Sequence, residues 1–340
     1  MEIVSKVGLS DLEDFVNRFS SSIYHTPQWK SFLERAFGYY PFYLFAVDES
    51  GQVVGFLPLF RVSGLFSRDR LCSVPFGHVC GPLGSAKTRN LLIQRAVELV
   101  GEGYAGALEV RESVGSPFFR EVNSFSTFVL GLTRDPFEVW RRLDKGSVRW
   151  AVNKAAKRGV RVERTHDVEC VKAFYELNCL TKRNLGVPCH PWSYFETMFE
   201  VFGEEVWLYL AKKGGDMIGG GVFLYHKDQV LYGYGAADLG RLNDYPYNAF
   251  IWESIKNACE EGYSSFDFGR TSYADVGLSK FKKRWGADEK KLFYSYFPAD
   301  AADKVLDRRS VLLSTVKECV SRVPLPIYKK FSDLVFRNFG

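Results

Sequence analysis

The predicted order of helices and strands occurs twice along the chain, and this doubling constrains the fold more than any other feature of the sequence. In each half, two helices precede a hairpin of strands, and a further strand, a helix and another strand follow. The hairpins are expected over residues 41–62 and 205–227, where turns containing glycine join runs rich in apolar residues. Because hairpin strands are antiparallel, each half is expected to form an α+β unit of about 130 residues with a mostly antiparallel sheet.

Local signals mark the ends of the expected helices. Ser10 and Glu13 have the spacing of a capping box, and Thr26 is an N-cap followed by Pro27 at the first helical position. Further helices are expected over 87–100, 167–185, 191–202, 246–261, 301–320 and 325–338. We therefore predict an N-terminal domain over 1–133, a second domain over 134–300 that starts with a basic helical connector (134–165), and C-terminal helices over 301–340.

Length and composition exclude several classes of protein. A chain of 340 residues exceeds the usual single core, and an apolar fraction of 46% is that of a globular protein. No apolar run is long enough to cross a membrane, and the N-terminus lacks the apolar segment of a secretory signal. The seven cysteines include no C-x-x-C pair, and the five histidines lack metal-binding spacing. We therefore expect a cytoplasmic protein with reduced thiols and no metal site.

Common catalytic motifs are missing from the sequence. It contains no G-x-x-x-x-G-K-[ST] phosphate loop, no G-x-G-x-x-G after a strand and no G-x-S-x-G elbow. Hydride transfer, ATP hydrolysis and serine hydrolysis therefore lack their usual machinery. The run Gly219–Gly221 falls inside an expected strand, which favours a bulge or a close backbone approach by a ligand.

Positive charge is concentrated between the two halves. Residues 141–164 contain nine lysines and arginines but only two acids, Asp144 and Glu163. One interpretation is a solvated helix face. The other is a surface for the phosphates of a nucleotide or of an RNA acceptor arm, formed by Arg149, Lys154, Lys157 and Arg158. No RNA-recognition motif accompanies the run, so sequence-specific reading of nucleic acid is not expected.

Two neighbouring segments offer side chains for chemistry. In the expected strand 265–271, alternation puts Phe266 and Phe268 on one face and Asp267 on the other. A carboxylate in that position, followed by Arg270, suits a strand end that opens into a cleft. The alternative is that Asp267 and Arg270 pair with each other or with the next loop.

The following short helix can be analysed by angle. Leu278, Phe281 and Trp285 fall on one side and are expected to face the core, whereas Lys283 points to solvent. Lys282 lies at the border of the apolar stripe, where it can reach a neighbouring cleft and stabilise an oxyanion or a phosphate. The alternative is a solvated basic face.

Taken together, several segments resemble successive blocks of FemAB-like proteins, which are related to the peptidoglycan bridge-forming aminoacyltransferases. The blocks are HTPQW at 25–29, GFLPLF, SVPFGH, LEVRE, RNLGVPCH, FDFGRT and FKKRWG. They extend from about residue 24 to 297, and FDFGR followed by G-x-x-x-FKxxWG is the most specific. The branch that the chain resembles is associated with exopolysaccharide and protein-sorting gene clusters.

The resemblance implies a fold and an activity. The fold is two tandem GNAT-like domains, matching the doubled element order. The family transfers an amino acid from aminoacyl-tRNA to an amine on a cell-wall precursor, without a bound cofactor. Simple GNAT relatives use acyl-CoA, held by a [RQ]-x-x-G-x-[GA] loop before a helix. The stretch GRLNDYPYN before the helix at 246–261 lacks that loop, and no coiled-coil insertion is present.

The resemblance also implies site residues. A phenylalanine–lysine pair lies by the reacting centre of bridge-forming members, which carries over to Phe281 and Lys282. Lys282 would stabilise the oxyanion of the acyl transfer, and Asp267 would orient or deprotonate the acceptor amine. The substrate-binding candidates are Arg270, Trp285, Gly269, Tyr234, Arg183, Trp29, Glu109 and Arg111.

Alternatives remain open for the donor, the acceptor and the location. The donor is expected to be aminoacyl-tRNA or, alternatively, acyl-CoA. The acceptor is expected to be a nucleotide- or lipid-linked envelope precursor, either peptidoglycan-like or a polysaccharide amine. A third interpretation is a binding module without turnover. The basic amphipathic helix at 325–338 either packs on the second domain or contacts the inner face of the cell membrane.

Overall fold

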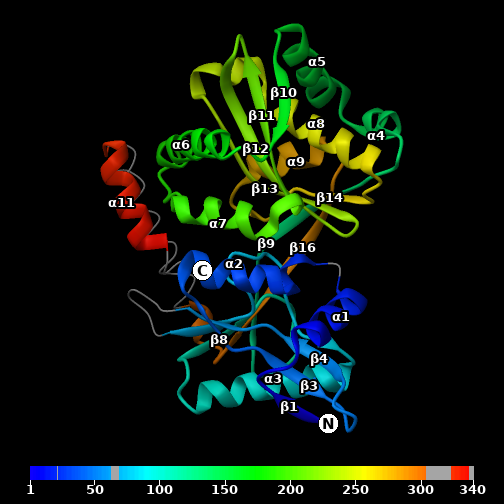
Figure 1. The fold of residues 1–340 in the computed structure, drawn as a ribbon, viewed down its shortest axis with the longest axis vertical. Coiled ribbons are helices and arrows are strands. Elements are labelled where there is room, and N and C mark those ends of the chain that lie inside the picture. The colour runs from blue at the N-terminus through cyan, green and yellow to red at the C-terminus, as the bar shows by residue number, and fades with distance from the viewer. Residues whose placement is uncertain (21, 63–68, 304–322, 337–340) are drawn as a thin grey trace. The chain divides into compact units, whose positions relative to one another are not determined.

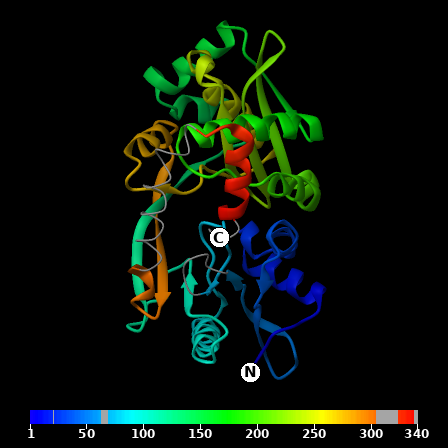
Figure 2. The same ribbon diagram turned by 90° about the vertical axis from the view of Figure 1, so that its left-hand side faces the viewer.

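The computed structural model describes residues 1–20, 22–62, 69–303 and 323–336, which form two compact units. Unit 1 contains residues 1–124 with the described parts of 292–316 and 333–340, and unit 2 contains 125–291 with the described part of 317–332. The long neighbouring strands β9 (Arg120–Gly131) and β16 (Asp288–Phe297) each have residues in both units (Figures 1 and 2).

This division differs from the predicted domain boundaries. Residues 295–297 at the end of β16 pair with β8 (Ala107–Val110) in unit 1, although the sequence assigned them to the second domain. Residues 125–131 of β9 belong to unit 2, although the prediction placed them in the first. Strand pairing between distant segments decides both cases, and local signals do not report such pairing.

Unit 1 contains two sheets and three α-helices among the described residues. One sheet has the order β1 (Glu2–Val4), β3 (Leu44–Val47), β4 (Val53–Leu57), β7 (Leu83–Gly84). Within the described ranges, four further strands of the unit belong to a twelve-stranded sheet, in the order β8, β6 (Arg70–Cys72), β5 (Phe60–Val62), β2 (Tyr40–Pro41). Of these, β6 and β8 are parallel. The helices are α1 (Leu9–Phe19), α2 (Pro27–Phe37) and α3 (Ala86–Gly101).

Local signals in unit 1 are confirmed in part. Thr26 caps α2 by accepting a hydrogen bond from the Trp29 N–H, and Gly38 ends the helix in the left-handed conformation. The capping-box prediction is wrong, because α1 starts at Leu9 after Gly8 and Ser10 lies inside its first turn. The expected hairpin forms between β3 and β4, but its second strand divides into β4 and β5 before and after Pro58.

Unit 2 is built on a six-strand run of one sheet. Its order is β10 (Arg161–Thr165), β11 (Val206–Lys213), β12 (Asp216–His226), β13 (Gln229–Ala237), β14 (Ser265–Asp267), β9. Every pair is antiparallel except β13 with β14. The α-helices assigned wholly to the unit are α4 (Pro136–Arg142), α5 (Trp150–Lys157), α6 (Val168–Asn184), α7 (Trp192–Phe202), α8 (Pro246–Glu261) and α9 (Val276–Arg284).

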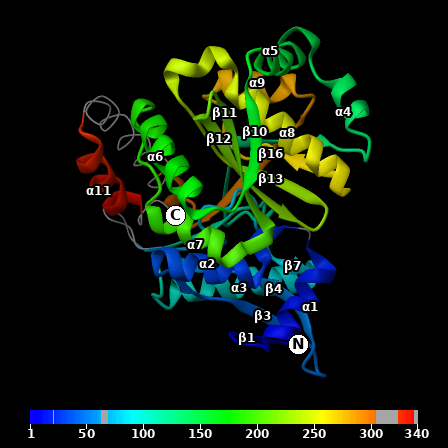
Figure 3. The same ribbon diagram turned by 45° about the horizontal axis from the view of Figure 1, so that its top comes forward.

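The glycine run in β12 lets helices pack closely on both faces of this sheet. A Cβ on Gly220 would lie 3.2 Å from Phe174 of α6, and a Cβ on Gly221 would lie 2.6 Å from Phe250 of α8. Successive residues of a strand face opposite sides, so α6 and α8 cover opposite faces, as Figure 3 shows. The expectation of a ligand at Gly219–Gly221 is therefore corrected, because helices fill the space. The alternative, a bulge, fits better: the register shifts on both sides of the run, between Met217 and Gly219 and between Val222 and Phe223.

The C-terminal helix α11 (Leu325–Phe336) forms within the range predicted for it. Tyr328 on this helix is buried, and its Oη donates a hydrogen bond of 2.6 Å to the Val187 carbonyl of unit 2. Ser332 accepts a 3.3 Å hydrogen bond from the Cys189 N–H. The helix expected over 301–320 falls almost entirely outside the described residues. Among the helices that are described, none has the length and hydrophobicity needed to cross a bilayer.

Candidate functional site

Strands β13 and β14 separate at their carboxyl ends. They pair in parallel from Gln229–Leu231 against Ser265–Asp267, and β14 then ends while β13 continues to Ala237 along β12. Residues 232–237 therefore have no strand partner on the β14 side. We call this region the fork, defined as residues 231–237 of β13 and 267–270 after β14. In sheets with parallel strands, ligands commonly bind beyond the carboxyl ends of the strands.

Asp267 holds the turn that ends β14. Its Oδ1 accepts hydrogen bonds from the Thr127 hydroxyl at 2.5 Å and from the Gly269 N–H at 2.8 Å. Gly269 has a φ of +72°, and an added Cβ would lie 3.2 Å from the Tyr232 carbonyl oxygen. Asp267 is buried, and Phe266 and Phe268 lie in the core, with ring centroids 4.9 Å apart, as the alternation predicted. The carboxylate therefore fixes the backbone at the fork.

Lys282 reaches the same turn from α9. Asp275 caps this helix by accepting from the Leu278 N–H, and the Lys282 side chain is only 3% exposed. Its Nζ donates to the Phe268 carbonyl at 2.6 Å and to the Gly269 carbonyl at 2.7 Å. An ammonium has three donors, and the third has no acceptor among the described residues.

Electrostatics at the fork favour a titratable ammonium. Burial lowers the pKa of Lys282 to about 8, and the carboxylates of Asp267 and Asp275 raise that pKa against the effect of burial. The Nζ also lies 5.7 Å from the centroid of the Phe128 ring. The group is therefore mostly charged at neutral pH and loses its proton under mildly alkaline conditions.

For the other predicted residues of α9, the observed burial agrees only in part with the burial predicted from the helix angles. Trp285 is fully buried against Phe268, and Phe281 packs on Trp285 at a centroid distance of 6.1 Å. Lys283 is exposed, as predicted, and pairs with Glu289. Leu278 was expected in the core but is 38% exposed; it lies in the first turn of a nine-residue helix in which Lys282 is the one buried residue. Burial of Trp285 against Phe268 fixes the end of α9 on the turn after β14, and its role in substrate binding stays a prediction.

A second group of side chains surrounds Tyr234 on β13. Its hydroxyl is hydrogen-bonded to that of Tyr194 on α7, and the His190 ring lies 4.4 Å from Tyr194 and 4.8 Å from Tyr234. Burial lowers the pKa of His190 well below its usual value, aided by the charge of Lys182, so the imidazole is neutral. Burial raises the pKa of Tyr234, and Arg270 opposes the rise.

Sequence reasoning missed Tyr194 and His190. The residue block RNLGVPCH ends at His190 and could have pointed to it. Arg270 follows the fork turn and lies over the Phe125 ring at 4.5 Å. Arg183 lies on α6, where its Nη1 donates to the Val323 carbonyl ahead of α11. The structure therefore brings Asp267, Gly269 and Lys282 together and relates Arg270 to Tyr234, while Arg183 contacts a different segment.

The basic candidates lie on the connector before β10. Arg149 is in the helical turn η2 (Lys145–Arg149), and Lys154, Lys157 and Arg158 follow on or just after α5. Arg158 donates to Asp244 at 3.2 Å, and Lys213 and Arg241 contact the same carboxylate at 2.7 and 3.1 Å. These cations lower the pKa of Asp244 to about 2. Arg158 is thus engaged within the protein, whereas Lys154 and Lys157 have no ion-pair partner among the described residues.

Three of the predicted residues belong to the interior of unit 1. Glu109 is fully buried and accepts from Arg70 Nε at 3.0 Å and from Arg111 Nε at 3.1 Å. Arg111 also donates to the Gly77 carbonyl. Trp29 is 2% exposed and packs edge-on against Tyr24. A buried, hydrogen-bonded ion network positions backbone segments, so Glu109 and Arg111 have a structural role in unit 1, and the substrate-binding role of all three residues stays a prediction.

Comparison with known proteins assigns the fold. Residues 144–283 match the model of a family described as an acetyltransferase (GNAT) domain. The structure of FemX aligns with a TM-score of 0.69 and 17% identity, covering 87% of this chain and 97% of FemX. The chain has the GNAT fold. The FemAB-like resemblance, the α+β class and the tandem GNAT arrangement predicted from the sequence are confirmed.

Two further structures show how widely this acyltransferase fold is shared. The C-terminal domain of a candidate lysylphosphatidylglycerol synthetase from Agrobacterium fabrum aligns with a TM-score of 0.61 and 14% identity, covering 89% of this chain and 96% of that one. A tandem GNAT protein from the clavulanic acid pathway aligns with a TM-score of 0.51 and 12% identity, covering 86% and 97%. No curated protein sequence matches this chain. The roles of individual residues and the family branch stay predictions.

Proposed function

We propose that this acyltransferase moves an aminoacyl group from aminoacyl-tRNA to an amine on a cell-envelope precursor, with the fork as the site of transfer. The observation that carries the proposal is the buried Lys282 ammonium, which is held by two carbonyls at the end of β14 and keeps one donor free. The likeness to FemX and to a structure named for lysylphosphatidylglycerol synthesis supports an aminoacyl donor and an envelope acceptor.

The transfer follows from the groups at the fork. The acceptor amine attacks the ester carbonyl carbon, a C–N bond forms, and the carbonyl electrons move to oxygen. The free N–H of Lys282 stabilises this oxyanion. When the intermediate collapses, the C–O bond to the ribose breaks, the amine loses a proton and the ribose oxygen gains one. Asp267, which fixes the turn carrying Gly269, positions Lys282 through the two carbonyls and keeps a carboxylate near the ammonium.

The segment before α8 favours aminoacyl-tRNA over acyl-CoA. A helix N-terminus binds a pyrophosphate through free backbone N–H groups. Here α8 starts at Pro246, which has no N–H, and the preceding turn carries the carboxylate of Asp244 with its three cations. This arrangement offers fewer donors and less free positive charge to a pyrophosphate.

A donor screen tests the proposal. The protein is incubated with charged tRNAs or with acyl-CoAs in an extract of envelope precursors, and new amide-bond mass shifts are measured. A product that requires charged tRNA supports the proposal. A product formed from acyl-CoA without tRNA would assign the acyl-CoA alternative, and binding of precursors with no product from either donor would assign the binding module.

The acceptor is identified in the same assay. We expect a nucleotide- or lipid-linked precursor that carries a primary amine, either peptidoglycan-like or polysaccharide. Treating the extract with an amine-blocking reagent before the assay should abolish the mass shift. An undiminished shift after blocking would contradict amide formation.

A further inference from the structure

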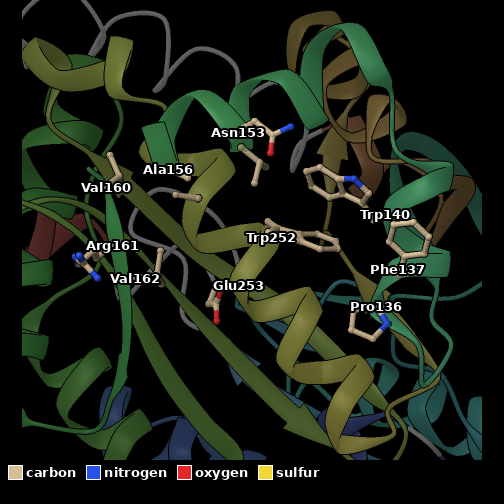
Figure 4. Close-up of a pocket in the computed structure, with 12 residues that line it drawn as sticks. Pro136, Phe137, Trp140, Asn153, Ala156, Val160, Arg161, Val162, Trp252 and Glu253 are labelled. Atoms are coloured by element: carbon tan, nitrogen blue, oxygen red, sulfur yellow. The ribbon is translucent and has the colours of Figure 1, made fainter. Parts of the chain in front are cut away.

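A separate hollow of about 700 Å³ lies on the α8 side of unit 2 and shares no lining residue with the fork. It is an open hollow, lined mainly by residues of α4, α5, β10 and α8 (Figure 4). Three aromatic residues line it, Phe137, Trp140 and Trp252. The rings of Trp140 and Trp252 lie 4.7 Å apart at an interplanar angle of 56°, and Phe137 is 61% exposed. The hollow therefore offers the exposed parts of three aromatic rings to a ligand.

Polar side chains line the same hollow. Asn153 comes from α5, Glu253 from α8 and Arg161 from the start of β10 (Figure 4). Glu253 is paired with Lys256 at 2.9 Å, whereas the amide of Asn153 and the guanidinium of Arg161 have no side-chain partner among the described residues. An amide and a carboxylate can pair with the edge of a planar heterocycle, whereas an acyl chain would leave them desolvated and unpaired.

In the described part of the chain, one free cation, Arg161, lines this aromatic hollow, and others lie on the adjoining helix α5. Asn153 and Lys157 are one helical turn apart on α5, so Lys157 lies beside the opening. Lys154, Lys157 and Arg161 have no ion-pair partner among the described residues, in contrast to Arg158, which pairs with Asp244. Aromatic stacking surfaces next to uncompensated cations are the combination that binds unpaired nucleotides.

We propose that this hollow binds an unpaired nucleobase of an RNA strand and that Lys154, Lys157 and Arg161 contact its phosphates. The proposal rests on the proposed tRNA donor, since it gives that RNA a second contact away from the fork. A membrane surface is less consistent with the geometry, because the two tryptophans line a concavity together with Asn153 and Glu253 instead of protruding.

The test measures binding of uncharged tRNA and of a 12-nucleotide single-stranded RNA by fluorescence polarisation over a range of salt concentrations. Trp140→Leu should weaken binding at least fivefold while leaving the salt dependence unchanged, because stacking involves no counterion release. Lys157→Glu should weaken binding and lower the slope of log K against log salt by about 1. Lys87→Glu, the same charge reversal on an exposed helix of unit 1, should change affinity less than twofold.

A second variant keeps the test valid if Trp140→Leu fails to fold. Phe137→Leu alters an exposed ring in the hollow, and it should also weaken RNA binding. Wild-type affinity in folded Trp140→Leu or Phe137→Leu protein would overturn the proposal. So would binding to phosphatidylglycerol vesicles that these substitutions weaken while RNA binding stays unchanged, since that result assigns the hollow to a membrane.

Failure of this inference can be distinguished from failure of the proposed function. If charged tRNA supports transfer and the hollow variants bind RNA and transfer normally, the hollow is not an RNA site although the donor is correct. If RNA binds and the hollow variants weaken it while charged tRNA gives no product, the RNA site stands and the donor assignment is wrong.

Discussion

Lys282 has a structural role, and the proposed mechanism gives the same side chain a chemical one. Two of its donors are fixed by the Phe268 and Gly269 carbonyls, and these bonds join α9 to the end of β14. A side chain held in this way loses little entropy when it meets a developing charge. The same bonds mean that removing the ammonium affects stability as well as rate, so both must be measured.

Replacing Lys282 with methionine should separate these roles. We expect kcat/KM for transfer to fall at least about 100-fold, because one oxyanion donor is lost. The free energy of unfolding should fall by only about 1–3 kcal/mol, because two buried carbonyls lose their donor. Transfer assays and urea denaturation measure the two effects. Lys280→Met, an exposed lysine on the same helix, is the matched control. Full activity in Lys282→Met would remove Lys282 from the mechanism.

The lowered pKa of Lys282 predicts an alkaline limit to activity. The folded-state pKa is about 8, against 10.5 for an unperturbed lysine. If the ammonium is the required form, kcat/KM should fall as the pH rises through about 8. Lys282→Arg keeps its charge and should remove that fall. An unchanged alkaline limb in the arginine variant would assign the titration to another group.

The same pKa shift predicts how the free energy of unfolding changes with pH. Because the pKa is depressed in the folded state, the unfolded chain binds more protons between about pH 8 and 10.5. The contribution of Lys282 to the free energy of unfolding therefore rises across that window and is lowest, and constant, below it.

Asp267→Asn removes a charge that raises the pKa of Lys282 and should move the alkaline limb of activity to lower pH.

At the scale of elements, the turn after β14 depends on one glycine. Gly269 has a positive φ, and its missing Cβ leaves room for the Tyr232 carbonyl oxygen at 3.2 Å. Gly269→Ala should lower the free energy of unfolding by more than Gly159→Ala, where φ is also positive but no atom lies within 4 Å. The control measures the backbone cost alone, about 1 kcal/mol. If thermal or urea denaturation gives equal losses of unfolding free energy for the two variants, the new Cβ at residue 269 does not clash with the Tyr232 carbonyl oxygen.

The docking of α11 can be tested in the same way. Tyr328 is 1% exposed, whereas its neighbour Ile327 is 60% exposed. Tyr328→Ala should therefore cost about 3–5 kcal/mol of unfolding free energy, and Ile327→Ala should cost less than about 0.5 kcal/mol. Differential scanning fluorimetry of the pair suffices. Similar melting temperatures for both variants would mean that this helix is not held on unit 2 in solution.

Periodicity predicted the elements of unit 2 well, because β11, β12, α6 and α8 are long and regular. Short elements were harder. The helix angles placed Leu278 in the core, since angles alone do not reveal that the first turn of α9 is exposed. His190 and Tyr194 were missed because their contact with Tyr234 joins residues 40 or more positions apart, as the Tyr194–Tyr234 hydrogen bond shows.

At the scale of the whole molecule, the doubled order of elements was sufficient to predict a tandem fold, but not the division of the chain. Strand β9 contributes residues to both units, and Val129–Gly131 pair with β14. A boundary drawn at 133/134 therefore separates β14 from a neighbouring strand. Pairing of this kind is long-range, and no local motif signals it.

Two fragments test this division. A fragment of residues 134–300 lacks β9 and would leave β14 as an open edge, so we expect low solubility and aggregation. A fragment of residues 120–300 retains β9 and should give a higher soluble yield and a higher melting temperature. Size-exclusion chromatography and circular dichroism compare the two. Equal behaviour would mean that β14 needs no partner on that side.

The three consecutive glycines of β12 limit which substitutions this strand can tolerate in evolution. Because α6 and α8 press on the bare backbone from opposite sides at adjacent positions, a mutation there must displace a helix whichever way the new side chain points. Sequence drift in that strand should be slow even where the rest of the chain has diverged. A glycine triplet followed by an apolar strand is thus a useful anchor for recognising distant relatives.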